Sequence, residues 1–332
     1  MKFTILGAGT WGTAVGQVLC DNNNDVMLYH FDQTIVDDIN LNSQNSMYFG
    51  DLILNKNLKA TSTLKEAIEF SNNIIFAVPS QNIEELLGNS LPFMKGKYNF
   101  INLIKGFAGK NNDLMIKFLS DIIPQEYVET ISSLIGPSHA EEVILRKVTA
   151  LCFVNKNIEV AQNMQKAFSN EYFRVYALED EVGAEFAASY KNAIAIGSGI
   201  LEGLELGDNA KAAFITRGLA EMMQVGRHFG GHTKTFLGLT GVGDLLVTCN
   251  SKHSRNFMFG YSIGKTKDVN EVLKNNTKTV EGYKTIKSLY ELSKAENLST
   301  PIIDSLYNVL YKNSKIEFEV SILMTRPLKK EF

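Results

Sequence analysis

The segment K-F-T-I-L-G-A-G-T-W-G at residues 2–12 decides how the first half of this 332-residue chain folds. Its last six residues match G-x-G-x-x-G, follow an apolar run and precede a segment with helical periodicity, and a second apolar run comes at 26–30. This strand–turn–helix–strand context predicts a dinucleotide-binding turn. Gly7 permits the tight turn, Gly9 lets a pyrophosphate approach the backbone, and Gly12 allows close helix–strand packing. The anion is expected at the free N–H groups of the helix.

Apolar, often β-branched runs alternate with helical periodicity through residue 176. The expected strands are 3–6, 26–29, 74–78, 100–104, 130–135, 150–154 and 173–176, and the expected helices are 11–20, 63–70, 112–122 and 157–168. This alternation predicts a Rossmann-type α/β domain, with a mostly parallel sheet covered by helices on both faces.

The strand pattern ends after residue 176. In L-E-D-E-V-G (178–183), Asp180 is placed to cap a helix whose first turn carries Glu181. Beyond it we expect almost only helices, at about 181–200, 208–229, 254–264, 281–296 and 301–313. The sequence therefore predicts two domains, a dinucleotide-binding domain at 1–178 and an all-helical substrate and catalytic domain at 179–332.

The composition is typical of a soluble globular protein, with 45% hydrophobic and 21% charged residues. A net charge of −3 argues against nucleic acid or an anionic membrane as the main partner, although a local cluster can hold a small anion. Cys20, Cys152 and Cys249 lack C-x-x-C spacing, which argues for a reducing compartment. Without a membrane span or a secretory signal, we expect a cytoplasmic protein.

The residues after the second strand bear on cofactor choice. An acidic residue about 20 positions beyond the glycine turn usually binds the ribose hydroxyls of NAD, whereas an Arg there suits the 2′-phosphate of NADP. Asp32 lies at about this distance, just past the strand, and no Arg is nearby. His30 can meet a phosphate when protonated, although a single His is more often structural. NAD and NADP both stay open.

Two segments are candidate anion sites at helix N-termini. S-R-N (254–256) combines a Ser cap, free N–H groups and an Arg capable of bidentate bonds, which together form a phosphate site. G-P-S-H-A-E-E (136–142) follows a predicted strand, and its S-x-x-E spacing predicts a capping box from Ser138 to Glu141. Ligands of open α/β sheets bind at such strand ends.

Three charged residues stand in unusual contexts. E-F-A-A-S-Y-K-N-A-I-A-I-G-S-G (185–199) predicts a buried helix in which apolar side chains surround Lys191, next to Asn192. A buried ammonium must find a partner, shift its pKa or extend to water. Lys105 directly follows a predicted strand, and T-G-V-G-D (240–244) places Asp244 in a flexible glycine turn.

A metal site is not expected. His228 and His232 have i, i+4 spacing, but Gly230 and Gly231 between them would break a helix. Arg217 and Glu221 are interpreted as a helical ion pair.

Taken in order, the motifs resemble those of the NAD(P)-dependent glycerol-3-phosphate dehydrogenases, especially the bacterial type. The match covers nearly the whole chain and runs through G-A-G-T-W-G, F-A-V-P-S (76–80), I-K-G (104–106), G-P-S-H-A-E-E-V (136–143), K-N-A-I-A-I (191–196), N-A-K-A-A-F-I-T-R-G-L (209–219), L-T-G-V-G-D-L-L-V-T-C (239–249), S-R-N and V-E-G (280–282). The Lys-Asn pair alone is shared with 3-hydroxyacid and 6-phosphogluconate-type dehydrogenases. Its combination with G-V-G-D and S-R-N is specific to the glycerol-phosphate family.

The resemblance implies reversible hydride transfer between NAD(P)H and dihydroxyacetone phosphate, giving sn-glycerol 3-phosphate for phospholipid synthesis. It further implies a C-terminal domain like that of 6-phosphogluconate dehydrogenase, a homodimer, and Lys191 as the proton acceptor for alcohol oxidation. The implied cofactor contacts are Gly7, Gly9, Thr10, Trp11, Gly12, His30, Phe31, Lys105, Ala140, Arg255, Thr279 and Glu281. The implied substrate contacts are Lys105, Gly136, Ser138, Lys191, Asp244, Ser254, Arg255 and Asn256.

One position departs from the family pattern, which often has Arg or His two residues after an aromatic at the end of strand two. Here Phe31 follows Tyr29 and His30, and a phenyl ring cannot bind a 2′-phosphate. His30 is left as the candidate to compensate.

The chemistry of this reaction accounts for a buried lysine. Burial is expected to lower the pKa of such a lysine toward working pH, so that the amine can take a proton from an alcohol and return it, while the ammonium stabilises developing oxyanion charge. Asn192 and Asp244 are candidates to orient Lys191. Asp244 would raise that pKa again, and which of the two effects prevails stays open. We expect Lys191→Ala to abolish turnover while sparing folding and cofactor binding.

Two other functions are compatible with parts of this pattern. One is a dehydrogenase of another phosphorylated or carboxylated hydroxy compound, which would use the same Lys-Asn pair. The other is a non-catalytic dinucleotide-sensing protein, which would need the glycine turn but not Lys191, Asp244 and Arg255 together.

Overall fold

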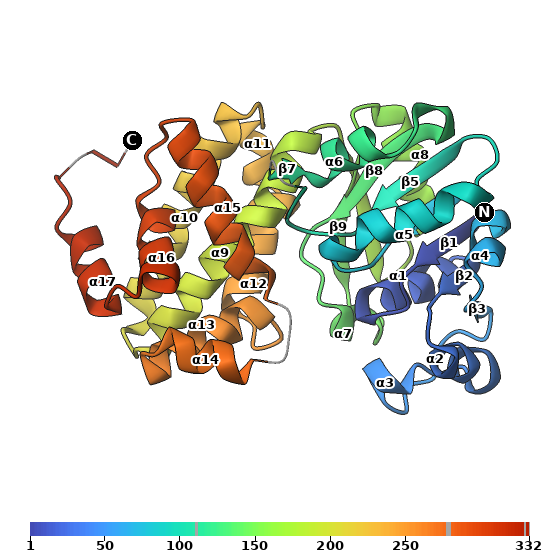
Figure 1. Cartoon of the computed structure of the whole chain (residues 1–332), viewed down its shortest axis with the longest axis horizontal. Coiled ribbons are helices and arrows are strands. Elements are labelled where there is room, and N and C mark those ends of the chain that lie inside the picture. Colours follow the sequence, from blue (N-terminus) through green and yellow to red (C-terminus); the bar gives the residue numbers. More distant parts are fainter. Residues whose placement is uncertain (110–111, 277–279, 329, 332) are drawn as a thin grey trace. The chain divides into compact units, whose positions relative to one another are not determined.

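The structure, a computed structural model, describes residues 1–109, 112–276, 280–328, 330 and 331 (Figure 1). The chain divides into two compact units, Met1–Glu185 and Phe186–Phe332. The division falls within the first two turns of helix α9 (Glu181–Gly203). Residue 178, where the sequence analysis places the domain boundary, is the last residue of strand β10 (Phe173–Leu178).

Unit 1 is built on an eight-stranded sheet with the order β10-β9-β8-β5-β4-β1-β2-β3. All neighbours are parallel except β8 and β9, which confirms the prediction of a mostly parallel sheet. The strands are β1 (Lys2–Leu6), β2 (Asp25–Tyr29), β3 (Leu58–Thr61), β4 (Asn73–Phe76), β5 (Tyr98–Asn102), β8 (Val128–Ile135), β9 (Thr149–Val154) and β10. The chain runs from β1 to β2 on one side and returns to β4 on the other, so the strand order reverses beside β1.

Helices cover both faces of this sheet because its strands are apolar on both sides. Alternate side chains of β1 enter two separate hydrophobic clusters, Phe3 and Ile5 in one and Leu6 in the other. The helices of unit 1 are α1 (Thr10–Asp21), α2 (Gln33–Asp37), α3 (Ser46–Phe49), α4 (Leu64–Phe70), α5 (Ile83–Ser90), α6 (Met115–Ile122), α7 (Ala140–Val143) and α8 (Ile158–Phe168). Helices α1 and α8 pack in the first cluster and α4, α5 and α6 in the second. A small hairpin, β6 (Phe107–Ala108) and β7 (Asp113–Leu114), precedes α6.

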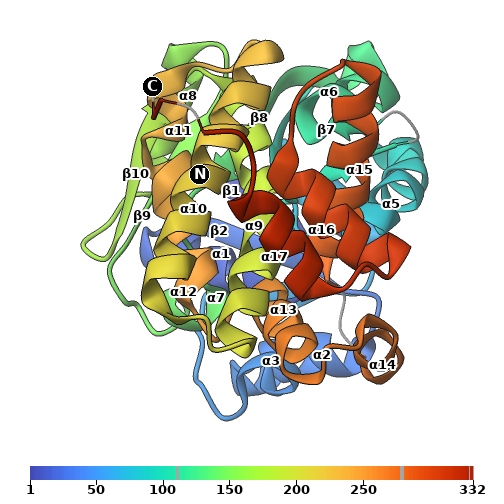
Figure 2. The same ribbon diagram turned by 90° about the vertical axis from the view of Figure 1, so that its left-hand side faces the viewer.

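The described part of unit 2 contains helices and no strands, as the sequence predicted. Its helices are the rest of α9, α10 (Gly207–His228), α11 (Thr233–Phe236), α12 (Asp244–Asn250), α13 (Arg255–Thr266), α14 (Val269–Asn275), α15 (Glu281–Ala295), α16 (Pro301–Lys312) and α17 (Ile316–Met324). Figure 2 shows α16 and α17 side by side at the C-terminal end. Among the described residues, no helix has the length and hydrophobicity needed to cross a membrane.

Helices α9 and α13 approach closely because glycines face each other. A Cβ at Gly199 would lie 2.0 Å from the carbonyl oxygen of Phe257, and a Cβ at Gly260 would lie 2.0 Å from that of Ile196. Such distances leave no room for any side chain at either position. This contact brings the N-terminal turn of α13 to the segment of α9 that carries Lys191 and Asn192.

Candidate active site

The glycine turn is tight on one side and open on the other. Gly7 has φ +122°, and a Cβ there would lie 2.5 Å from the carbonyl oxygen of Ala77, which follows β4. A Cβ at Gly12 would lie 1.9 Å from the oxygen of Gly7. At Gly9, by contrast, a Cβ would meet no atom within 4 Å. The turn therefore has the open backbone that a pyrophosphate needs, at the point where the strand order reverses.

A buried donor lies beside this turn. Thr10 and Trp11 are the first two residues of α1, and the Trp11 indole Nε1 is buried without a hydrogen-bond partner among the described residues. Buried donors are rarely left unpaired in a complete structure. The residues present fit a dinucleotide, which would bring polar atoms to this turn.

The loop that carries Lys105 is fixed by a buried polar network. Asn102, the last residue of β5, accepts the N–H of Ile104 through Oδ1 (2.8 Å) and donates to its carbonyl oxygen through Nδ2 (3.0 Å). The buried carboxylate of Glu185 accepts the Ser133 hydroxyl (2.7 Å) and lies 3.3 Å from Asn102 Nδ2. These bonds hold the segment before Lys105 at the carboxyl end of β5.

The predicted capping box at Ser138 is wrong. The Ser138 hydroxyl donates to the carbonyl oxygen of Gly136 (3.0 Å), and helix α7 begins two residues later, at Ala140, which is buried. Gly136 has φ +155°, and a Cβ there would lie 2.5 Å from the Leu151 side chain. The chain therefore turns sharply after β8, and the serine is used within that turn instead of at the helix.

Lys191 is buried and has a counter-charge. Its side chain is 5% exposed, and Nζ donates to Asp244 Oδ1 (2.6 Å) and to Thr248 Oγ1 (2.8 Å). Asp244 and Thr248 are one turn apart on α12, and the Thr248 hydroxyl donates to the carbonyl oxygen of Asp244 (2.6 Å). A buried ammonium can find a partner, shift its pKa or extend to water, and in this structure Lys191 has found partners.

Asp244 does not lie in a flexible glycine turn, as the sequence led us to expect. Leu239–Gly243 forms a π-helical turn that leads directly into α12, and the Asp244 side chain is 1% exposed. A Cβ at Gly241 would lie 1.9 Å from the carbonyl oxygen of Phe236, so the glycine serves close packing. Thr248 is a site residue that the sequence analysis missed, although its i, i+4 spacing from Asp244 was a usable signal.

Asn192 belongs to a second set of hydrogen bonds next to this pair. Asn256 Nδ2 donates to Asn192 Oδ1 (2.9 Å), and Asn256 Oδ1 accepts the N–H of Gly282 (2.9 Å). Asn192 Nδ2 lies 3.5 Å from Oε2 of Glu281, the first residue of α15. Both of these Asn256 bonds are made to protein groups, and they position Asn192 and the start of α15. Thr279, another expected cofactor contact, lies outside the described residues.

The start of α13 has the features of an anion site. Ser254 is the N-cap, and its hydroxyl accepts the N–H of Phe257 (3.2 Å), as the S-R-N motif predicted. Arg255 is the first residue of the helix and is exposed. A helix N-terminus beside a guanidinium favours a dianionic phosphate.

A buried carboxylate supports α9 one residue before Lys191. The Tyr190 hydroxyl donates to Glu221 Oε1 (2.8 Å), and Glu221 accepts the N–H groups of Ile302 (2.9 Å) and Ile303 (3.1 Å) in the first turn of α16. The predicted Arg217–Glu221 ion pair is wrong, because Glu221 is 5% exposed and Arg217 pairs with Glu331 (2.8 Å). Burial raises the pKa of Glu221 to about 7, and burial likewise raises the pKa of Glu185 to about 7.

These two carboxyl groups predict how stability varies with pH. Because folding raises each pKa from 4.5 to about 7, each group binds its proton more tightly in the folded state. The stability they contribute is therefore complete below about pH 4.5 and is lost as pH rises to about 7, by roughly 3 kcal/mol per group. We expect Glu221→Gln to flatten this decline in urea unfolding measured from pH 5 to pH 8. Exposed Glu84→Gln is the control, and a Glu221→Gln variant with the wild-type slope would contradict the assignment.

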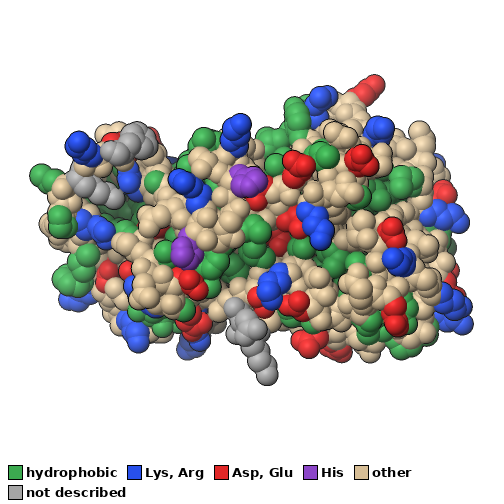
Figure 3. Space-filling model, turned by 90° about the horizontal axis from the view of Figure 1, so that it is seen from above, with side chains coloured by type: hydrophobic (Ala, Val, Ile, Leu, Met, Phe, Trp, Pro, Cys, Tyr) green, Lys and Arg blue, Asp and Glu red, His purple; other side chains and the backbone are tan. Residues whose placement is uncertain are grey.

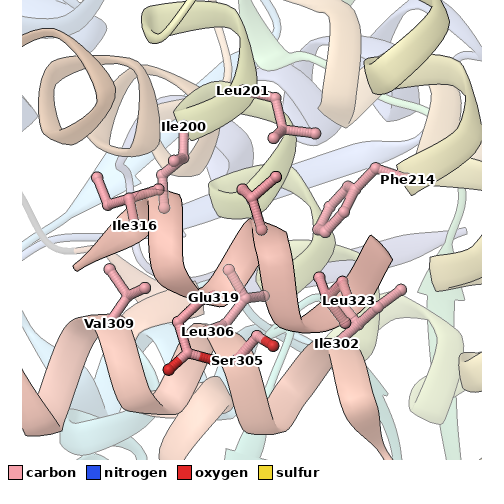
Figure 4. A pocket seen from close by; sticks show the side chains of 12 residues that line it. Ile200, Leu201, Phe214, Ile302, Ser305, Leu306, Val309, Ile316, Glu319 and Leu323 are labelled. Carbon is pink, nitrogen blue, oxygen red and sulfur yellow. The ribbon is translucent and has the colours of Figure 1, made fainter. Parts of the chain in front are cut away.

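Unit 2 also contains an apolar cavity of about 40 Å³, which is not part of the site around Lys191. Its lining comes mainly from α9, α10, α16 and α17 and includes Leu201, Phe214 and Leu306 but neither Lys191 nor Asp244 (Figure 4).

Among the described residues, no group of three His, Cys, Asp or Glu side chains is arranged to hold a metal ion. On the face seen in Figure 3, basic and acidic side chains are interspersed.

Comparison with known proteins agrees with both halves of this arrangement. Residues 2–161 match the family model for the NAD-dependent glycerol-3-phosphate dehydrogenase N-terminus, and residues 180–321 match the model for its C-terminus. A glycerol-3-phosphate dehydrogenase [NAD(P)+] of Bacillus pumilus is 43% identical over 98% of this chain and 94% of its own length. A second, from Staphylococcus carnosus, is 39% identical over 99% of both chains.

Solved structures give the same result. The glycerol-3-phosphate dehydrogenase of Coxiella burnetii superposes with a TM-score of 0.88 at 31% identity, covering 98% of this chain and 99% of that one. That of Plasmodium falciparum has a TM-score of 0.90 at 25% identity, covering 99% and 97%. The resemblance found in the sequence is confirmed, and the chain belongs to the NAD-dependent glycerol-3-phosphate dehydrogenase family.

Proposed function

We propose that this chain catalyses reversible hydride transfer between NAD(P)H and dihydroxyacetone phosphate, forming sn-glycerol 3-phosphate. The observation that carries the proposal is the buried Lys191, paired with Asp244 and Thr248 on the same bundle that presents Ser254 and Arg255. A sensor protein needs the glycine turn but has no use for a desolvated ammonium beside an anion site. The choice of substrate rests on the names of the relatives, which are glycerol-3-phosphate dehydrogenases.

A nicotinamide cofactor held at the glycine turn by Gly7, Gly9 and Gly12 would supply the hydride for the carbonyl carbon. Lys191 Nζ then donates its proton to the carbonyl oxygen, and in the reverse direction it takes the proton from the alcohol. As hydride arrives, the ammonium also stabilises charge that develops on that oxygen, and burial away from water strengthens this effect. Asp244 and Thr248 fix Nζ in place, and the Asn256–Asn192 bond orients the neighbouring amide.

Family membership and the strand-end geometry support the assignment of the remaining site residues. For cofactor we assign Gly7, Gly9, Thr10, Trp11, Gly12, His30, Phe31, Lys105, Ala140, Arg255 and Glu281. For substrate we assign Lys105, Gly136, Ser138, Lys191, Asp244, Ser254 and Arg255, with Asn256 positioning Asn192. A homodimer, a cytoplasmic location and a role in phospholipid synthesis complete the proposal. The free, buried thiols of Cys20, Cys152 and Cys249 support a reducing compartment.

The direct test is oxidation of NADH and of NADPH, followed separately by absorbance, with purified protein and dihydroxyacetone phosphate. Turnover with at least one cofactor, and none with unphosphorylated dihydroxyacetone at the same concentration, is the expected result. No turnover by folded protein that binds cofactor would shift the assignment to another phosphorylated carbonyl compound or to a sensor.

Arg255→Gln tests the phosphate contact. We expect KM for dihydroxyacetone phosphate to rise about 10- to 100-fold, the effect of losing about 1.5–3 kcal/mol of charged hydrogen bonding. Folding should be unaffected, because the Arg255 side chain is exposed. Arg227→Gln, which removes an exposed arginine from α10, is the matched control. An unchanged KM in Arg255→Gln would place the phosphate elsewhere.

A further inference from the structure

The carboxyl end of β2 is where the adenosine ribose of a dinucleotide lies in this type of fold. In this chain the residues that follow β2 are His30, Phe31 and Asp32. Their side chains therefore decide whether a 2′-hydroxyl or a 2′-phosphate is accommodated. The inference below rests on the proposed function, since it concerns which dinucleotide that reaction uses.

Asp32 is held in place and carries a negative charge. It is the N-cap of α2, where Oδ1 accepts both the backbone N–H (2.9 Å) and the hydroxyl (2.7 Å) of Thr34. These bonds from Thr34 lower the pKa of Asp32 below its ordinary value. A fixed carboxylate accepts hydrogen bonds from ribose hydroxyls and repels a phosphate on the same ribose.

His30 does not supply the compensating positive charge that the sequence analysis considered. Its Nδ1 accepts the backbone N–H of Asp32 (3.1 Å), which is possible only while that nitrogen is unprotonated. Burial lowers the pKa of His30, so the ring is uncharged at neutral pH. Phe31 stacks on this ring with centroids 4.6 Å apart, and its own side chain is 82% exposed. The pair offers a flat apolar surface and no cation.

The distribution of charged residues along the chain also argues against a site for a 2′-phosphate. There is no Lys or Arg between Lys2 and Lys56, a stretch that contains six aspartates. On the neighbouring strand β3, Lys59 pairs in register with Met27, two residues before the carboxyl end of β2. The next cation, Lys65, is exposed in the first turn of α4.

We propose that this enzyme selects NADH over NADPH, with Asp32 as the specificity-determining residue and Phe31 as a surface for the adenine ring. Lys191 serves the proposed proton step, and Arg255, which is assigned to both substrate and cofactor, is not among the residues that follow β2, where the adenosine ribose lies in this type of fold. The preference belongs to the adenosine end of the site and is independent of which carbonyl compound is reduced.

Binding without substrate tests the proposal, because the chain has a single tryptophan, Trp11, in the glycine turn. Energy transfer from Trp11 to reduced nicotinamide gives dissociation constants for NADH and NADPH separately. We expect NADH to bind at least about tenfold more tightly. Asp32→Asn keeps a good helix cap and removes the charge, so the ratio should fall by about tenfold or more, mainly through tighter NADPH binding.

Asp25→Asn makes the same chemical change at the opposite end of β2, roughly 13 Å along the strand, and should leave the ratio as it is. Lys65→Gln should do the same. NADPH binding as tightly as NADH, or a ratio unaffected by Asp32→Asn, or a loss of NADPH affinity in Lys65→Gln, would overturn the inference while leaving the proposed reaction intact. Binding of neither cofactor would refute the proposed function as well.

Discussion

Lys191→Met is expected to lower kcat for dihydroxyacetone phosphate reduction by at least about 10³-fold. The variant loses both the proton donor and the ammonium that stabilises oxyanion charge, two contributions that are each typically worth 10²-fold or more. Cofactor affinity, measured through Trp11, should be unchanged because the glycine turn belongs to unit 1. Lys211→Met is the control, since that lysine pairs with Glu202 (2.8 Å), whose side chain is 43% exposed.

The structure adds a stability cost that the sequence did not reveal. Removing the Lys191 ammonium leaves the Asp244 carboxylate buried without its counter-charge, which typically costs about 3–5 kcal/mol. The double variant Lys191→Met/Asp244→Asn removes both charges and should recover much of this loss while staying inactive. Near-normal turnover in either variant, with folding verified by circular dichroism, would show that Lys191 is not the proton donor.

The sequence predicted those parts of the site that depend on local pattern. The glycine turn is recognisable because Gly7, Gly9 and Gly12 stand within six residues, between one strand and the helix that follows it. Ser254 was correctly placed as a cap because a cap bonds within one turn. Asp180 is another such case, since its Oδ1 accepts the N–H of Gly183 (2.8 Å) at the start of α9.

What the sequence missed depends on partners far along the chain. Glu221 bonds to residues 81 and 82 positions away, separations over which no periodicity carries information. Such partners are fixed by tertiary packing.

Local exceptions account for two further differences between the sequence pattern and the structure. Strand β3 was not predicted because L-K-A-T (58–61) is short and includes a charged residue at its exposed position. The glycines before Asp244 were interpreted as a flexible turn, whereas they pack a π-helical turn against the backbone of Phe236. In both cases tertiary contact outweighed the local preference.

Substitutions at two glycines of the dinucleotide turn should separate cofactor binding from folding. Gly9 has φ −75° and ψ −170°, which alanine adopts, and its Cβ would point into open space. We expect Gly9→Ala to unfold like the wild type but to bind NADH about 100-fold more weakly, because its methyl group occupies the space in which the pyrophosphate meets the backbone.

Gly12→Ala should instead fail at the level of the fold. Its Cβ would lie 1.9 Å from the Gly7 oxygen and 3.0 Å from the Ala77 Cβ, so helix α1 must move away from the ends of β1 and β4. Overpacking of this kind costs about 1–3 kcal/mol, measured as a lower urea midpoint, and cofactor affinity falls with it. Wild-type NADH affinity in Gly9→Ala would contradict the pyrophosphate position, whereas wild-type stability in Gly12→Ala would contradict the close contact between α1 and the turn.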